Sequence, residues 1–145
     1  TSIDNLGATV HKDAMDNLFN TMHNNGAFFS NLMIVANGTQ KIKLSNIYGY
    51  APESRNVGGV NVEQLETDFG RIMIMKPHRF MDTDKILVVE MDVVKPVFQP
   101  VPNKGNFFVE PLAKTGASED HQIFGKFGLD HGPAYAHGLL TNLAV

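Results

Sequence analysis

The sequence contains no cysteine among its 145 residues. This absence excludes disulfide bonds, thiol nucleophiles and zinc sites with cysteine ligands, and it fits a chain that matures in a reducing compartment. The sequence also lacks any apolar run near the roughly 18–20 residues that a membrane span needs, and it shows no signal peptide. We therefore expect neither a disulfide scaffold nor a membrane partner.

An excess of charge of one sign is missing too. The formal net charge is −3 and the sequence pI is near 6.0, so the chain has no field that would hold nucleic acid by phosphate contacts. With 43% hydrophobic and 19% charged residues, disorder is not expected. Residues 1–145 are predicted to form a single domain or a fragment of one. Because the chain opens on Thr1 rather than Met, we expect it to come from something longer.

Two short motifs invite an enzymatic interpretation, and each lacks its partners. Asp68-Phe69-Gly70 copies the metal-binding tripeptide of protein kinases, but the chain has neither a Gly-rich loop nor a His-Arg-Asp catalytic loop. Lys114-Thr115-Gly116 copies a signature of serine β-lactamases, but no Ser is followed three residues later by Lys. A turn is the better interpretation of the second motif.

The six histidines do not have metal-site spacing. None of them forms the i, i+4 pair of a zinc-binding helix, so we expect no metal ligand, no cofactor site and no catalytic residue. Two alternatives from other classes are kept. One is a small hydrolase whose site is assembled by tertiary contacts among Asp68, His78 and His121. The other is a β-rich binding module with an aromatic groove.

The N-terminal third predicts a helix, a strand and a second helix. Apolar residues recur at four-residue intervals from Val10 to Met22, which predicts a core-facing helix over Thr9–Asn24 with Thr9 as its N-cap. Leu32–Ala36 is a short apolar run that indicates a buried strand. Lys41–Tyr48 favours a short helix, although its alternation also suits a strand. The polar segment Gly49–Asn61 indicates an exposed connection.

The centre of the chain predicts two core strands. Val62–Phe69 alternates between two faces, with Leu65 and Phe69 on the same one, and Ile72–Met75 is apolar on both sides, so the segment should start half-exposed and end buried. Pro77 should stop this strand near Lys76. The second run is Ile86–Val94, and we expect the two runs to pair as a core ribbon.

The C-terminal part predicts extended structure interrupted by turns. Prolines force an extended path through Lys95–Gly105, and Asn106–Glu110 indicates a short strand that Pro111 ends. A turn is expected at Lys114–Ser118. In the last extended run one parity is apolar and the other polar: Ile123, Phe127 and Leu129 against Gln122, Lys126 and Asp130. From Pro133 a close-packed strand or helix should follow. The predicted fold class is α+β, a mixed or antiparallel sheet with one main helix packed on it.

Three segments, taken in order, resemble the major head (capsid) proteins of tailed bacteriophages. They are Glu66–Gly70, Pro77–Met81 and Glu110–Gly116, the last placed before a final long strand. The resemblance implies a capsid fold of the Hong-Kong-ninety-seven type. It further implies that this chain is the C-terminal portion of a longer subunit, with most of its axial domain and part of its peripheral domain.

The resemblance also implies a function. The chain would be a structural virion protein that self-assembles into the icosahedral shell around phage DNA, without catalysis or cofactor. Its partners would be copies of itself in pentamers and hexamers, with other head proteins as further candidates. No sequence-specific nucleic acid binding and no membrane are implied. It would be made in the host cytoplasm and reside in the virion. Gly49–Asn61 and Lys95–Gly105 would be contact loops, or else plain surface loops.

Overall fold

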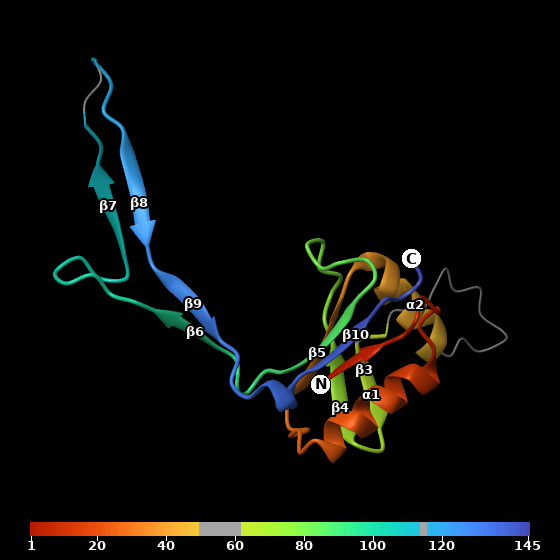
Figure 1. The fold of residues 1–145 in the computed structure, drawn as a ribbon. Helices are drawn as coiled ribbons and strands as arrows, with labels where there is room; N and C mark the ends of the chain where they lie inside the picture. Colours follow the sequence, from red (N-terminus) through yellow and green to blue (C-terminus); the bar gives the residue numbers. More distant parts are fainter. Residues whose placement is uncertain (50–61, 114–115) are drawn as a thin grey trace. The chain divides into compact units, whose positions relative to one another are not determined.

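The computed structural model describes residues 1–49, 62–113 and 116–145, and they form two compact units. Unit 1 comprises Thr1–Val93 and Gly132–Val145, and unit 2 comprises Val94–His131. Figure 1 traces both units along the chain. The expectation of a single domain or fragment over residues 1–145 stays a prediction.

Unit 1 is built on a six-stranded sheet. Its strand order is β1-β10-β5-β2-β4-β3. The strands are β1 (Ser2–Asp4), β2 (Leu32–Ala36), β3 (Gln64–Thr67), β4 (Gly70–Ile74), β5 (Ile86–Glu90) and β10 (Gly138–Thr141). Strands β1 and β10 pair in parallel, as do β2 and β4, whereas the other neighbours are antiparallel. The mixed sheet confirms the predicted fold class, and β2 has the bounds that the sequence predicts.

Two helices contribute to the core of unit 1. They are α1 (Lys12–Asn24) and α2 (Gly38–Tyr48). The apolar stripe of α1 faces the core, as predicted: Met15, Leu18, Phe19 and Met22 are fully buried and Ala14 is partly buried. Helix α2 confirms the helical alternative for its segment, and the Asn37 side chain caps it by accepting a hydrogen bond from the Thr39 N–H at 3.3 Å.

The predicted N-cap of the first helix is wrong by two residues. Helix α1 is capped by His11, whose backbone is extended, and not by Thr9. The reason lies at the other end of the chain, because the Ala8 carbonyl accepts a hydrogen bond from the Ala144 N–H at 3.0 Å. Val10 is buried in the core although it lies before the helix. The predicted end is confirmed, since α1 ends at Asn24, just before Gly26 with φ +85°.

One face of the sheet is buried and the other is half-exposed. On β2 and β5 every second side chain is buried, and the register aligns them, with Ile34 opposite Val88. On β10, Gly138 leaves room for α1, because a Cβ there would meet Met22 and Leu18. Residues of both helices and of five strands belong to this one core cluster.

The expected pairing of the two central runs is wrong. Strands β4 and β5 both lie in the sheet, but β2 lies between them. Strand β2 pairs in parallel with β4 and antiparallel with β5. The 11 residues from Met75 to Lys85 therefore cross over β2 instead of turning directly into a hairpin. The prediction paired β4 with β5 because they are consecutive in sequence. The strand that separates them, β2, comes from much earlier in the chain.

The segment from Gln64 to Ile74 is not one continuous strand. It forms a hairpin in which β3 pairs with β4. Thr67 lies opposite Gly70, whose φ is +121°, and the turn consists of Asp68 and Phe69. Leu65 is buried, so the face of β3 that carries it is the inner one. Met73 and Met75 are each 42% exposed, so the expectation that both sides of this run are buried is wrong. The strand ends at Ile74, ahead of Pro77, close to the predicted stop.

Unit 2 consists of two antiparallel strand pairs. Strand β6 (Lys95–Phe98) pairs with β9 (Phe127–Asp130), and β7 (Phe107–Pro111) pairs with β8 (His121–Gly125). Pro96 lies inside β6, so the predicted extended path is a paired strand there, and β7 ends at Pro111, where the sequence predicts the stop. A two-stranded ribbon has two edges, where a residue without an N–H is tolerated.

The remaining predictions concern the end of the chain and two loops. After Pro133 the chain has both expected elements, the short helix η1 (Ala134–Ala136) and then β10. Apart from Gly49, the predicted loop Gly49–Asn61 lies outside the described residues. So do Lys114 and Thr115 of the predicted turn.

Candidate interaction surfaces

Unit 2 is a narrow ribbon, which we call the arm (Val94–His131). Its outgoing and returning stretches of chain run side by side, with β6 paired to β9 and β7 paired to β8 (Figure 1). Directly opposed residues of an antiparallel pair point to the same face. The register therefore sorts the side chains of the arm into two faces.

One face of the arm is apolar, and we call it the apolar face. Ring contacts join its two strand pairs, since Phe107 lies 5.8 Å from Phe98 and 6.4 Å from Phe127 between ring centroids. Six large side chains of this face are between 41% and 79% exposed: Phe98, Phe107, Val109, Ile123, Phe127 and Leu129. A continuous apolar surface of this kind marks an interaction site.

The opposite face of the arm is held together by its own contacts. Lys104 donates a hydrogen bond to the Glu110 carboxylate at 3.0 Å, and its ammonium lies 4.5 Å from the centre of the Phe108 ring. Phe108 in turn contacts Phe124, its cross-strand partner, at 5.4 Å. The hydrogen bond and charge of Lys104 lower the pKa of Glu110. These contacts stabilise the arm internally, and the opposite face exposes two large apolar side chains, Val97 and Phe124, against six on the apolar face.

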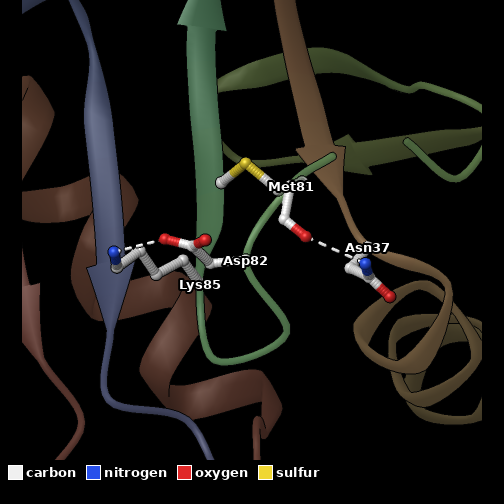
Figure 2. Close-up of polar contacts among 4 residues, drawn as sticks. All are labelled: Asn37, Met81, Asp82 and Lys85. Carbon is white, nitrogen blue, oxygen red and sulfur yellow. Dashed lines mark hydrogen bonds and ion pairs between the residues drawn. The ribbon is translucent and has the colours of Figure 1, made fainter. Parts of the chain in front are cut away.

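A second surface is the loop between β4 and β5, residues 75–85. Figure 2 shows one of its anchors, where the Asn37 side chain donates to the Met81 carbonyl at 2.9 Å. The His78 N–H also donates to Ala36 O at 3.0 Å, and Gln40 donates to Thr83 O at 2.7 Å. Lys85 and Asp82 form an ion pair within the loop (Figure 2). These bonds hold the loop to the start of α2 and the end of β2.

The pinned loop presents an exposed cluster of His78, Arg79 and Phe80, which we call the Arg79 cluster. The Arg79 guanidinium carbon lies 4.8 Å from the centre of the Phe80 ring, a cation–π distance. The His78 ring lies 5.9 Å from the same ring. Phe80 is 78% exposed although it is a large apolar residue. The cluster therefore combines a largely exposed aromatic ring with a permanent positive charge.

A cavity of about 520 Å³ lies between α1, the end of α2 and the β3–β4 turn. We call it the Tyr48 cavity; Lys12, Asp16, Glu66, Asp68 and Phe69 are among the residues that line it. The Tyr48 hydroxyl has no hydrogen-bond partner within the described residues. Burial, followed by the charge of Asp16, raises the pKa of this hydroxyl to about 12, so it stays protonated. The cavity thus combines a buried hydroxyl, an aromatic wall and carboxylates.

A buried acid fastens the end of β5, where the chain leaves unit 1. Glu90 is 1% exposed, and its carboxylate accepts hydrogen bonds from the N–H groups of Ser30 at 3.2 Å and Asn31 at 2.9 Å. Asp92 accepts from the Ser30 hydroxyl at 2.7 Å and the Asn31 amide at 3.1 Å, and these bonds lower its pKa. Sequence reasoning missed this cluster. Its signal was an acid on the inner parity of β5, in line with Ile86 and Val88.

The structure does not assemble the hydrolase alternative. Asp68 precedes β4 and His78 follows it, so these two side chains lie at opposite ends of the same strand. His121 belongs to β8 of unit 2. Across residues 1–49, 62–113 and 116–145, no three His, Asp or Glu side chains are grouped to hold a metal ion. No helix in the described part of the chain is long and apolar enough to cross a membrane.

The two predicted contact loops have different outcomes. Lys95–Gly105 is part of the arm, where it supplies Phe98 to the apolar face and Lys104 to the opposite one. The Gly49–Asn61 segment stays a prediction because it falls outside the described residues. Sequence reasoning did not find the Arg79 cluster or the Tyr48 cavity as surfaces. The Arg79 cluster consists of consecutive residues, and the sequence left only its exposure undecided, whereas the side chains of the Tyr48 cavity come together through the packing of α1, α2 and the β3–β4 turn.

Comparison with known proteins gives one family. A family model described as SU10 major capsid protein matches residues 1–144. No curated protein matches the chain. The match covers both units, so the arm and the six-stranded sheet are features of the matched region.

Proposed function

This chain belongs to the SU10 major capsid protein family, and from that premise we propose how its copies hold together. Its role is structural: it is a phage major capsid subunit, and copies of it assemble into the shell of the virion. We propose that the apolar face of the arm is buried against a neighbouring copy in that shell. The six exposed side chains of the apolar face carry this proposal.

The physical argument concerns stability. An isolated two-stranded ribbon is marginally stable in water at best, and the arm exposes most of its large apolar side chains instead of burying them. A fully covered Phe side chain buries about 150–250 Å², so covering Phe98, Phe107 and Phe127 would remove a large part of an interface-sized area from water. In a protein whose function is self-assembly, a second copy is the natural cover.

Finer features of the shell follow as parts of the same proposal. The subunits would group as pentamers and hexamers in a closed icosahedral shell around DNA, without catalysis, and other head proteins would contact it. The chain would be the C-terminal portion of a Hong-Kong-ninety-seven-type subunit made in the host cytoplasm. The mixed α+β sheet and the family membership support this proposal.

A pair of neighbouring substitutions tests the proposal in the full-length protein. Ile123 is 79% exposed on the apolar face, and Gln122 is its exposed neighbour on the opposite face. Ile123→Lys should leave the melting of the unassembled subunit unchanged and abolish shells in negative-stain microscopy. Gln122→Lys, the matched control, should assemble like the unaltered protein.

Two results would contradict the proposal. Normal shells from Ile123→Lys would mean that no copy covers the apolar face. A large loss of stability in the dilute, unassembled Ile123→Lys subunit would instead assign the cover to another segment of the same polypeptide. Sedimentation velocity identifies the unassembled state in which the melting is measured.

A further inference from the structure

We propose that the Arg79 cluster of one copy docks into the Tyr48 cavity of the next copy. The inference rests on the proposed function, because it needs copies that assemble, but it concerns surfaces of unit 1 and not the arm. It assigns a specific contact between unlike surfaces to residues outside the apolar face.

The Arg79 cluster is prepared for binding before it meets a partner. The Asn37 and His78 hydrogen bonds hold the loop, so the backbone loses little conformational freedom on association. The guanidinium is already placed over the Phe80 ring, and that ring is 78% exposed. Arg and aromatic side chains are the residues that most often dominate protein interfaces. Burial of an exposed ring on a rigid loop is favourable, and it costs little conformational entropy because the loop is already ordered.

The Tyr48 cavity offers the complementary chemistry. Three carboxylates line it, those of Asp16, Glu66 and Asp68, against the single ammonium of Lys12. Glu66 forms an exposed ion pair with Arg71 at 3.5 Å. The carboxylates of Asp16 and Asp68 are therefore the ones we expect to bind an incoming cation. A guanidinium has five donors, which carboxylates and the phenolic oxygen of Tyr48 can accept. Phe69 supplies an apolar wall for the incoming ring.

The positions of the two surfaces determine the symmetry of the contact. The β3–β4 turn immediately precedes Gly70 at the start of β4, and the loop that carries the Arg79 cluster begins just after Ile74 at its end. The two surfaces are therefore separated by the length of the strand, and the Arg79 cluster of a copy cannot fill the cavity of the same copy. A contact between unlike surfaces is head-to-tail, and a head-to-tail contact that closes on itself makes a ring. Rings are the units from which a closed shell is built.

Charge reversal and its rescue test the contact in the full-length protein. Arg79→Glu and Asp68→Arg should each reduce the yield of shells at least tenfold, and the double variant should restore most of it, because the new charges again attract. Both positions lie in exposed turns, so the melting of the unassembled subunit should not change. Lys126→Glu, on the arm, is the control with the same charge change and should assemble normally.

The outcomes separate the inference from the proposed function. Normal shells from Arg79→Glu would overturn the inference and leave the capsid function intact. Loss in both single variants without rescue in the double variant would also overturn the pairing. If the unaltered full-length protein formed no shells under any condition, the proposed function itself would fail.

Cross-linking gives a readout that does not depend on yield. The 145-residue sequence has no cysteine, so a disulfide between two introduced cysteines reports on one contact. Phe80→Cys combined with Asn20→Cys, a position that lines the cavity, should give a ladder of covalent oligomers that stops at the ring size on a denaturing gel. Phe80→Cys combined with Gln122→Cys should give none. A ladder of equal strength from both pairs would contradict the inference.

Discussion

The Phe107 ring lies over Gly125, its cross-strand partner, in the space where any other residue would carry a Cβ. The ring can cover the backbone there only because the partner is glycine. From that position it contacts both Phe98 and Phe127 and so joins the two strand pairs of the arm. A glycine on one strand thus decides the continuity of the apolar face.

Gly125→Ala should displace this ring without affecting unit 1. The new methyl group would overlap the Phe107 ring and lie 3.0 Å from Asn106 O, so the ring must rotate away. Loss of the ring contacts should be visible as shifted aromatic NMR signals of Phe98 and Phe127. Unit 1 should melt at its original temperature, and a drop in that temperature would show that the arm supports the sheet.

Gly138→Ala tests the packing of α1 on the sheet. A Cβ at Gly138 would overlap the Met22 sulfur and lie 3.2 Å from Leu18 Cδ1, so we expect a loss of about 1–3 kcal/mol in the free energy of unfolding, as for other overpacked cores. Gly128→Ala is the matched control, because nothing lies within 4 Å of its Cβ position. Denaturant melts that give equal stabilities for both variants would refute this packing.

Leu18→Ala should be among the most destabilising changes in unit 1. The Leu18 side chain is 0% exposed, and removal of a buried leucine costs about 2–5 kcal/mol. Ile42→Ala, at a helical residue that is 64% exposed, should cost well under half as much. Urea unfolding monitored by circular dichroism measures both. A change below about 0.5 kcal/mol for Leu18→Ala would place α1 on the surface.

The Ser30–Asp92 hydrogen bond should make stability depend on acid pH. It lowers the pKa of Asp92 below its ordinary value of 3.8, so its stabilisation is complete above that pH and is lost as the pH falls through the lowered pKa. Ser30→Ala should raise the Asp92 pKa toward the ordinary value and flatten this acid dependence. An NMR titration of the Asp92 carboxyl measures the change, and identical titration curves would exclude the contact.

Elements with strong local signals were predictable. The α1 stripe repeats at helical spacing and ends at Asn24-Asn25-Gly26, and Leu32–Ala36 is short and apolar between polar neighbours. In the last extended run the parity of Ile123, Phe127 and Leu129 correctly gave one side of the arm. These signals depend only on residues close in sequence, because helix and strand periodicity are local properties of the backbone.

Long-range hydrogen bonds decided where prediction failed. Helix α1 starts later than predicted because the Ala8 carbonyl accepts a hydrogen bond from the N–H of Ala144, at the far end of the chain. Strands β4 and β5 were separated by β2, which no local pattern could place between them. Glu90 became a buried clamp only because Ser30 and Asn31 arrive at its carboxylate.

The sequence by itself determined the fold class, most of the strands and the resemblance to phage head proteins, since all three depend on the order and periodicity of residues. Only the tertiary structure decided which surfaces are left uncovered. The apolar parity of Ile123 and the position of Phe80 shortly after Pro77 do not show how exposed these two side chains are. Whether an apolar side chain is buried depends on what the rest of the chain brings to it, and for these two residues the described chain brings no cover.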